Sequence, residues 1–315
     1  MSVLILKPGL QTTIQSCPRI GLRHLGVPAS GAADPLSMAL ANRLVGNAWD
    51  EPALEATLLG PVIEFDAPCA FALTGGRASA TLNGEVLVFH ETHFASRGDV
   101  LDIGALTVGA RVYFAVAGGL GADEMLGSTS TYSLAGFGGF QGRALAAGDA
   151  LTVVPALRVR AKSTPAAFRP PMTHSWALRA TTAPETGKLS TRGRDVLFDT
   201  NWTVDRRADR MGIRLDGPRL DVGSDGRMAS AAVFPGTVQC PEDGAPFVLG
   251  VDAGTVGGYP RVAHVAGVDR HLLGQLRPGD HLRLLERSPD EAVEALRAML
   301  DYWREWLPEI AEILL

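Results

Sequence analysis

The pattern of apolar and polar positions along the chain predicts mostly short β-strands. Short apolar runs end at Gly, Pro, Asp or Asn, which is typical of strands separated by turns. The segment LNGEV, Leu82–Val86, predicts a tight hairpin, because Asn-Gly accommodates the positive φ angles of a type I′ turn. We expect strands in PVIEFDAP, CAFALTGG, ATLNGEVLVF, DVLDIG, RVYFAVAGG, DALTVVP, GTVQC, PFVLGVD, RVAHVAG and HLRLLE.

Helical periodicity is clear in two segments. Apolar residues within Asp34–Val45 recur at helical spacing, with Asp-Pro at the start as cap and first residue, and with Gly46 as a stop. The second helix is expected near the C-terminus, where Ser288 and Glu291 have the spacing of a capping box. The chain is therefore predicted to be mainly β with few helices.

A boundary between two modules is expected between Pro155 and Pro171, because this stretch is rich in proline, basic and without a clear period. The predicted modules are residues 1–160 and 172–315.

Both modules contain the pattern Gly-Asp-x-Leu ahead of a predicted strand, at 148–151 and at 279–282, and a third copy lies at 98–101. Gly-Asp is a common turn before a strand, and this preference explains the repetition without a common ancestor of the two modules. The alternative, two related β modules fused in tandem, stays open on the sequence alone.

Composition and charge narrow the function classes. The 315 residues carry a net charge of −5, which argues against nucleic acid or an anionic membrane as the main partner. No apolar run reaches the ~20 residues that a membrane span needs, and the apolar run at the start is too short for a signal peptide. Cys17, Cys69 and Cys240 are scattered rather than arranged as a disulfide framework, so we expect a reducing cytoplasm.

The sequence lacks the familiar motifs for nucleotide phosphates, dinucleotides and serine hydrolases. His90 and His93 lie three apart in a strand-like region and face opposite sides there, so we expect no metal site. There is no biotin-accepting Met-Lys-Met. We therefore expect this chain to bind no cofactor, and ATP or biotin, if needed, to come through a partner subunit.

The most unusual segment is GVPASGAADPLSMALANRLVGN, residues 26–47. The start of a helix offers unpaired N–H groups and the positive end of a dipole, so Ser30, Gly31 and Asp34 could hold a carboxylate, carbamate or phosphate. Alternatively, Asp34 simply caps the helix and Ser30 satisfies the turn. The local sequence leaves both interpretations open.

Three other polar clusters are candidates for ligand contacts. Residues 125–145 combine hydroxyl side chains, glycines and Arg143, either as a surface loop or as a loop that closes over an anion. Residues 207–215 contain Arg210 before an apolar run. Residues 251–265 leave a strand at Asp252 and continue through glycines that permit close approach to a ligand.

Six stretches in order resemble the KipA family, also known as allophanate hydrolase subunit 2 or the biotin-dependent carboxyltransferase-like family. Members include the C subunit of bacterial ATP-dependent 5-oxoprolinase, and related domains occur in urea carboxylase. The resemblance implies two tandem cyclophilin-like β-barrel modules. The stretches are GVPASGAADPLSMALANRLVGN, ALEATLLGP, GSTSTYSLAGFGGFQGRAL, DRMGIRL, GTVQCPEDGAPFVLGVD and GGYPRVAHV.

The resemblance also implies a hydrolase subunit that works with a KipI-like partner, and with a LamB/YcsF-like subunit, on an amide, lactam or urea-like substrate. An alternative is a non-catalytic, regulatory partner of a KipI-like protein. Asp252 and Asp34 are the candidate catalytic groups, because acid–base work needs carboxylates near the reacting atoms. The candidate substrate-binding residues are Arg19, Ser30, Asn42, Arg143, Arg210, Gln239, Thr255 and Tyr259.

The chain departs from the family pattern at four polar positions. Where the family has Gln-Asp-x-Gly-Arg, Ser-Glu-Gly and Asp-x-Gln-Thr-Thr-Gly-Gly-Tyr, this chain has Ser16, Ala231, Gly254 and Val256 at the polar positions. Loss of such groups changes how a polar ligand is recognised. Two expectations follow, a different substrate or weakened catalysis.

Overall fold

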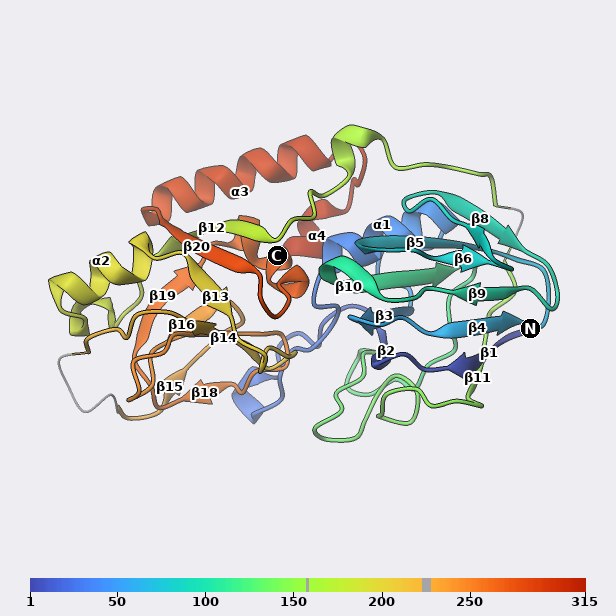
Figure 1. Ribbon diagram of the computed structural model, residues 1–315. Helices are drawn as coiled ribbons and strands as arrows, with labels where there is room; N and C mark the ends of the chain where they lie inside the picture. The colour runs from blue at the N-terminus through green and yellow to red at the C-terminus, as the bar shows by residue number, and fades with distance from the viewer. Residues whose placement is uncertain (157–158, 223–227) are drawn as a thin grey trace. The chain divides into compact units, whose positions relative to one another are not determined.

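The computed structural model describes residues 1–156, 159–222 and 228–315, and the chain forms two compact units (Figure 1). Unit 1 comprises residues 1–19, 30–172 and 306–313, and unit 2 comprises residues 20–29, 173–305 and 314–315. The segments 20–29 and 306–313 thus belong to a different unit from the residues that flank them. The predicted modules, residues 1–160 and 172–315, did not assign these two segments to the other unit.

Unit 1 contains two antiparallel sheets. The first has the order β11 (Ala150–Thr152), β1 (Ser2–Lys7), β4 (Val62–Phe65), β9 (Val100–Asp102), β6 (Thr81–Leu82) and β7 (Glu85–Val86). The second has the order β2 (Gln11–Gln15), β3 (Ala53–Thr57), β10 (Leu106–Val116), β5 (Cys69–Ala78) and β8 (Thr92–Ala95). The predicted hairpin is confirmed: Asn83 and Gly84 join β6 to β7 with φ of 53° and 86°.

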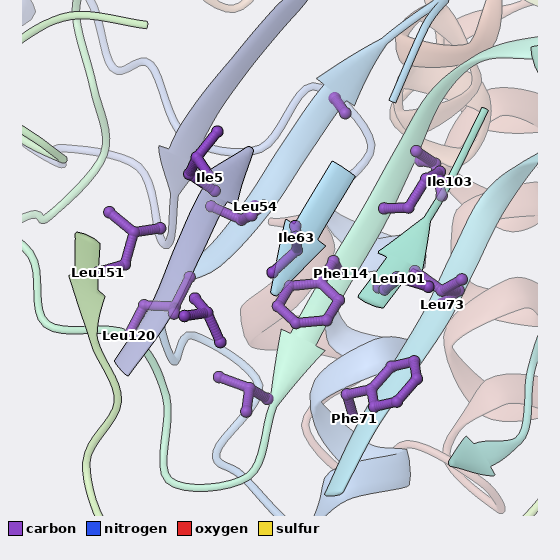
Figure 2. Packing of buried hydrophobic residues seen from close by; sticks show 14 of the residues in the cluster. Ile5, Leu54, Ile63, Phe71, Leu73, Leu101, Ile103, Phe114, Leu120 and Leu151 are labelled. Carbon is purple, nitrogen blue, oxygen red and sulfur yellow. The ribbon is translucent and has the colours of Figure 1, made fainter. Parts of the chain in front are cut away.

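The core of unit 1 is built from inward-facing residues of both sheets (Figure 2). Phe65, Phe71 and Phe114 form an aromatic group within it, with ring centroids 5.2 to 6.3 Å apart. Along β5, Phe71 and Leu73 point into this core, while Ala70 and Ala72 belong to a second cluster with helix α1. Both faces of β5 are therefore buried, which explains its continuous apolar run.

Helix α1 (Pro35–Val45) packs on the second sheet, against β5 and β10. Small residues at Ala72 and Ala115 allow the helix to approach the strands closely. The helix begins after Asp34, as predicted, and ends at Gly46, whose φ of 81° closes it with a left-handed residue. Unit 1 also contains the short 3₁₀ helix η2 (Ala166–Phe168).

Unit 2 is a closed barrel. Its strands, in order around the barrel, are β12 (Ser175–Thr181), β19 (Arg261–Val265), β16 (Thr237–Gln239), β17 (Phe247–Leu249), β14 (Gly212–Asp216), β13 (Trp202–Val204) and β20 (His281–Glu286). β12 and β20 pair in parallel to complete the closure. Beside the barrel, β15 (Ala231–Ala232) and β18 (Val256–Gly257) form a two-stranded ribbon. The mainly β fold with few helices is confirmed.

Helices accompany the barrel and its connections. The C-terminal helix α3 begins with the predicted capping box of Ser288 and Glu291 and packs against η4 and β12. Two further α-helices of the described residues were not predicted, because α2 is short and contains a glycine, and α4 has only five residues. The helices of unit 2 are η1 (Arg23–Leu25), η3 (Thr186–Lys188), α2 (Thr191–Asp199), η4 (Gly267–Gln275) and α3 (Pro289–Trp303), whereas α4 (Ile310–Leu314) lies almost entirely in unit 1. Within the described ranges, no helix is long and apolar enough to cross a membrane.

The three Gly-Asp-x-Leu segments form the same kind of turn. Each glycine has a left-handed φ, between 86° and 90°. The aspartate carboxylate then accepts a hydrogen bond from the backbone N–H three residues earlier, at Ser96, Ala146 and Arg277. Turn chemistry therefore explains why this pattern precedes β9, β11 and β20.

Candidate functional site

The N-terminus of α1 is held by a buried polar network. The Asp34 carboxylate accepts hydrogen bonds from the Ser37 backbone N–H at 3.0 Å and from the Ser37 hydroxyl at 2.5 Å. The Asp34 N–H donates to the Tyr113 hydroxyl at 2.8 Å, which donates to Glu55 at 2.7 Å, and the Ala33 N–H also donates to Glu55 at 2.8 Å. Asp34, predicted to be catalytic, thus serves as the helix cap.

Glu55 and Tyr113 are functional candidates that the sequence analysis missed. Burial, reinforced by the nearby charge of Glu55, raises the pKa of Tyr113 well above its usual value, so the phenol keeps its proton and donates a hydrogen bond to Glu55. Arg111 lies 3.3 Å from the other oxygen of Glu55 and compensates its charge. A single carboxylate within the apolar strand ALEAT is the sequence signal that could have identified this position.

Ser30 occupies a strained position ahead of this helix. Its φ is 54°, an uncommon left-handed value for a residue other than glycine, and Gly31 follows with φ of 88°. The Ser30 side chain is buried, and its hydroxyl has no hydrogen-bond partner among the described residues. Asn42, at the other end of the helix, donates to the Trp49 and Glu51 carbonyls and thereby holds the following turn.

Arg19 organises the loop of residues 125–143 rather than standing open to solvent. It is buried, and its guanidinium donates to the backbone carbonyls of Met125 at 3.0 Å, Ser128 at 3.4 Å and Ser130. The guanidinium also lies over the Phe137 ring, 4.8 Å from its centroid. The predicted anion clamp thus binds carbonyl oxygens of its own chain.

A cluster of hydroxyl groups lies at one end of this loop. The Ser16 N–H donates to the Ser130 hydroxyl at 2.9 Å, and the Thr129 hydroxyl donates to that of Ser16 at 2.7 Å. Ser128 donates to the Cys17 carbonyl at 2.7 Å. Ser16, one of the four divergent positions, therefore forms part of an internal hydroxyl network.

Arg143 forms a separate ion pair in unit 1. Its two terminal nitrogens bind the two oxygens of Asp149 at 2.7 and 2.9 Å, and its guanidinium lies over Phe140. The hydrogen bonds from Arg143 hold the pKa of Asp149 below its usual value. The predicted clamp is thus paired within the Gly148-Asp149 turn.

In unit 2, the structure brings Arg210 and Asp252 together. Arg210 Nε and Nη2 donate to the two carboxylate oxygens at 2.7 and 3.1 Å, and both side chains are buried. The predicted catalytic carboxylate is therefore held in a two-point ion pair with a predicted anion clamp. This geometry orients the carboxylate and neutralises its charge.

The remaining predicted residues of unit 2 lie close to the β15–β18 ribbon. Buried Gln239 donates to the Tyr259 carbonyl at 3.1 Å, and the Thr255 carbonyl accepts from the Val233 N–H at 3.1 Å. Within the ribbon, divergent Ala231 pairs with Gly257, and Ala232 with divergent Val256, which is 64% exposed.

Two further arginines bind this ribbon: Arg261, which lies in the candidate stretch 251–265, and Arg23, which lies outside every candidate stretch. Arg261 pairs with Glu185 through two nitrogens, each at 2.7 Å, and donates to the Ala232 carbonyl at 2.9 Å. Arg23, on η1, donates to the next carbonyl, that of Val233. The partner carbonyl of Arg23 lies 210 positions away in the sequence, so no local pattern identified this residue.

Other candidate chemistry lies outside these residues. His93 contacts the Val88 carbonyl at 2.8 Å, and the described residues contain no group of His, Cys, Asp and Glu able to hold a metal ion. A surface pocket beside α2 and β20 is lined by charged side chains that pair with one another, including Arg194 with Glu286. It contains none of the predicted site residues.

Comparison with known proteins places these features in a family. Residues 25–286 match the model of the carboxyltransferase domain, subdomains A and B. The chain is 34% identical to the 5-oxoprolinase C subunit of Escherichia coli, over 96% of both chains. It is also 34% identical to urea amidolyase of Lachancea kluyveri, over 93% of this chain but only 18% of that protein. The crystal structure of the K. lactis urea amidolyase superposes with a TM-score of 0.90 at 31% identity, covering 96% of this chain and 20% of that one.

Proposed function

This chain belongs to the family of carboxyltransferase domains with subdomains A and B, and we propose that it is a subunit of a heteromeric enzyme that opens a lactam or related amide. The substrate class that we favour is the one named by its relative of equal length, 5-oxoproline, and the activity is then that of a 5-oxoprolinase-like hydrolase.

The full-length match to the 5-oxoprolinase C subunit carries this proposal. That relative and this chain correspond over 96% of both lengths. The chain spans about a fifth of the urea amidolyases that it matches, so the activity of those whole proteins is a weaker guide than that of the relative covered over 96% of its length.

We assign orienting roles to the two candidate catalytic carboxylates. Asp252 is held by Arg210, and Asp34 by Ser37, so each has a fixed position and fixed hydrogen-bond partners. Such fixed groups are suited to positioning a substrate or a reacting partner rather than to exchanging protons freely. We assign contacts with the substrate to Gln239, Thr255 and Tyr259, which lie close to the β15–β18 ribbon.

The proposal includes partner subunits in the cytoplasm. The relative of equal length is named as one subunit of a larger enzyme, and we propose a KipI-like and a LamB/YcsF-like subunit as the partners of this chain. ATP, or a carboxylated biotin, would then be bound by those partners. The three cysteines of this chain are free thiols, as suits a reducing compartment.

Co-expression tests the proposal directly. The chain is produced with its KipI-like and LamB/YcsF-like neighbours, and ATP hydrolysis that depends on 5-oxoproline is measured. We expect activity from the full set and none when this chain is omitted. Unchanged activity without this chain would refute the subunit role.

A second candidate function is regulatory binding of a KipI-like protein without catalysis. The observation that favours it is the ribbon of β15 and β18, where Ala231 and Val256 replace polar residues of the family pattern and Val256 stays exposed. At these two positions the ribbon therefore offers no side-chain hydrogen-bonding group to a polar substrate. If replacement of both Arg210 and Asp252 by apolar residues leaves complex formation and function unaltered, the regulatory role is favoured.

A further inference from the structure

Arg23 carries a positive charge that no carboxylate balances among the described residues. Its Nη2 donates to the carbonyls of Val233 and, at 3.4 Å, Gly254. Its Nη1 is buried and has no hydrogen-bond partner in the described part of the chain. A guanidinium stays protonated in proteins, so a charged donor is left unsatisfied.

Two other arginines bind residues near the Arg23 contacts in the sequence, and both are paired with carboxylates. Arg210 is paired with Asp252 and Arg261 with Glu185, each through two hydrogen bonds. Of these three arginines, Arg23 is the one whose hydrogen bonds go to carbonyl groups and not to a carboxylate. A ligand that balances it carries one negative charge, which favours a carboxylate over a phosphate dianion.

Phe234 covers this guanidinium. The Arg23 guanidinium carbon lies 5.2 Å from the centroid of the Phe234 ring, and Phe234 is 50% exposed. An exposed side chain changes rotamer rapidly, so the ring is able to move aside for a ligand and then pack on it. The site thus combines one charged donor with an apolar wall, as expected for a small organic anion.

We propose that Arg23 binds the carboxylate of the substrate through Nη1, and that it makes the site selective for a carboxylate-bearing lactam over neutral urea. The inference rests on the proposed function for the identity of the lactam. It assigns to Arg23 the anion contact that Arg143 and Arg210 do not offer, since each of those is paired with a carboxylate of this chain.

The test compares two lactams that differ only in the carboxylate, 5-oxoproline and 2-pyrrolidinone. Their binding is measured by isothermal titration calorimetry on the full-length chain, with its partner subunits where they co-purify. We expect 5-oxoproline to bind about 10- to 100-fold more tightly, as is typical of a hydrogen bond to a charged group. Equal binding of the two lactams, or no binding of 5-oxoproline, would overturn the proposal.

Two substitutions locate the contact. R23M should remove the preference for 5-oxoproline, and R23K should retain part of it because the charge remains. R207M is the matched control, since Arg207 is an exposed arginine paired with Asp205. An R23M chain that is folded and keeps the full preference for 5-oxoproline over 2-pyrrolidinone would refute the role of Arg23. If R23M fails to fold, the comparison of the two lactams on the wild-type chain still tests the proposal.

Kinetics separate this inference from the proposed function. If omission of the chain abolishes turnover but R23M leaves KM for 5-oxoproline unchanged, the subunit role stands and the Arg23 contact is refuted. If the wild-type chain prefers 5-oxoproline through Arg23 but its omission leaves turnover intact, the contact stands and the catalytic role fails.

Discussion

Arg210 and Asp252 form a two-point ion pair in which both side chains are buried. The Nε–Oδ2 distance is 2.7 Å and the Nη2–Oδ1 distance is 3.1 Å, and the Asp252 N–H donates to the Arg210 carbonyl at 3.0 Å. The two segments, 42 residues apart, are thus tied by side chains and backbone together. Removal of Asp252 would take away the carboxylate that both Nε and Nη2 of the buried Arg210 bind.

Asp252→Ala should therefore destabilise the protein by about 3–5 kcal/mol, the usual cost of breaking a buried ion pair from one side. Urea denaturation followed by tryptophan fluorescence measures the loss. The double variant R210M/D252L should recover much of it, because it removes the buried guanidinium together with the carboxylate that this guanidinium binds. Asp205→Ala is the control, because its partner Arg207 is exposed. This variant should lose little free energy of unfolding. A loss no greater in D252A than in D205A would contradict this account.

The role of Asp34 is tested by a substitution that keeps the cap but removes the carboxylate. Serine is also a preferred N-cap residue, so D34S should be closer to the wild type in thermal stability than D34A, which should lose about 1–2 kcal/mol. If Asp34 acts only as a cap, D34S should also retain activity in the reconstituted complex. A folded, inactive D34S would instead identify the carboxylate as a catalytic group.

Features with a local cause were predictable from the sequence. The cap at Asp34, the Asn83-Gly84 hairpin and the capping box at Ser288 each depend on residues only a few positions apart. Turn and cap chemistry is determined within such short stretches, so the pattern was sufficient.

Features created by distant pairing were not predictable. The Arg23 contact with the Val233 carbonyl joins residues 210 positions apart, and the contact of Tyr113 with Glu55 joins residues 58 positions apart. A sequence identifies the residue types but not the tertiary partner. The anion clamps expected at Arg19 and Arg143 therefore proved to be held by a carbonyl cluster and by Asp149.

The low pKa of the buried His90 predicts that the protein loses stability in mild acid. Burial, together with the nearby charge of Arg169, lowers the pKa of His90 to about 4 from its usual 6.5. Because the folded state then binds fewer protons than the unfolded state, the free energy of unfolding should fall as the pH falls from 6.5 towards 4. The full loss from this group approaches about 3 kcal/mol.

The variant His90→Asn isolates this contribution. Asparagine tolerates the left-handed backbone at position 90, where φ is 65°, and does not titrate. Urea denaturation at a series of pH values should show a shallower decline for H90N than for the wild type. H24N, at an exposed histidine, should decline as the wild type does. Parallel curves for H90N and the wild type would rule out His90 as the source.

The glycine-rich loop around Arg19 allows a matched pair of substitutions. Gly138 and Gly136 both have left-handed φ, 73° and 69°, so an alanine is strained equally at either position. A Cβ at Gly138 would collide with the Ser130 carbonyl and the Arg19 guanidinium, whereas a Cβ at Gly136 meets open space. G138A should therefore lower the stability by more than G136A, which should lose about 1 kcal/mol from backbone strain alone. The difference in free energy of unfolding between the two variants measures the packing of the loop on Arg19. Equal losses would mean that the loop yields to the extra methyl group, and that Arg19 does not fix its position.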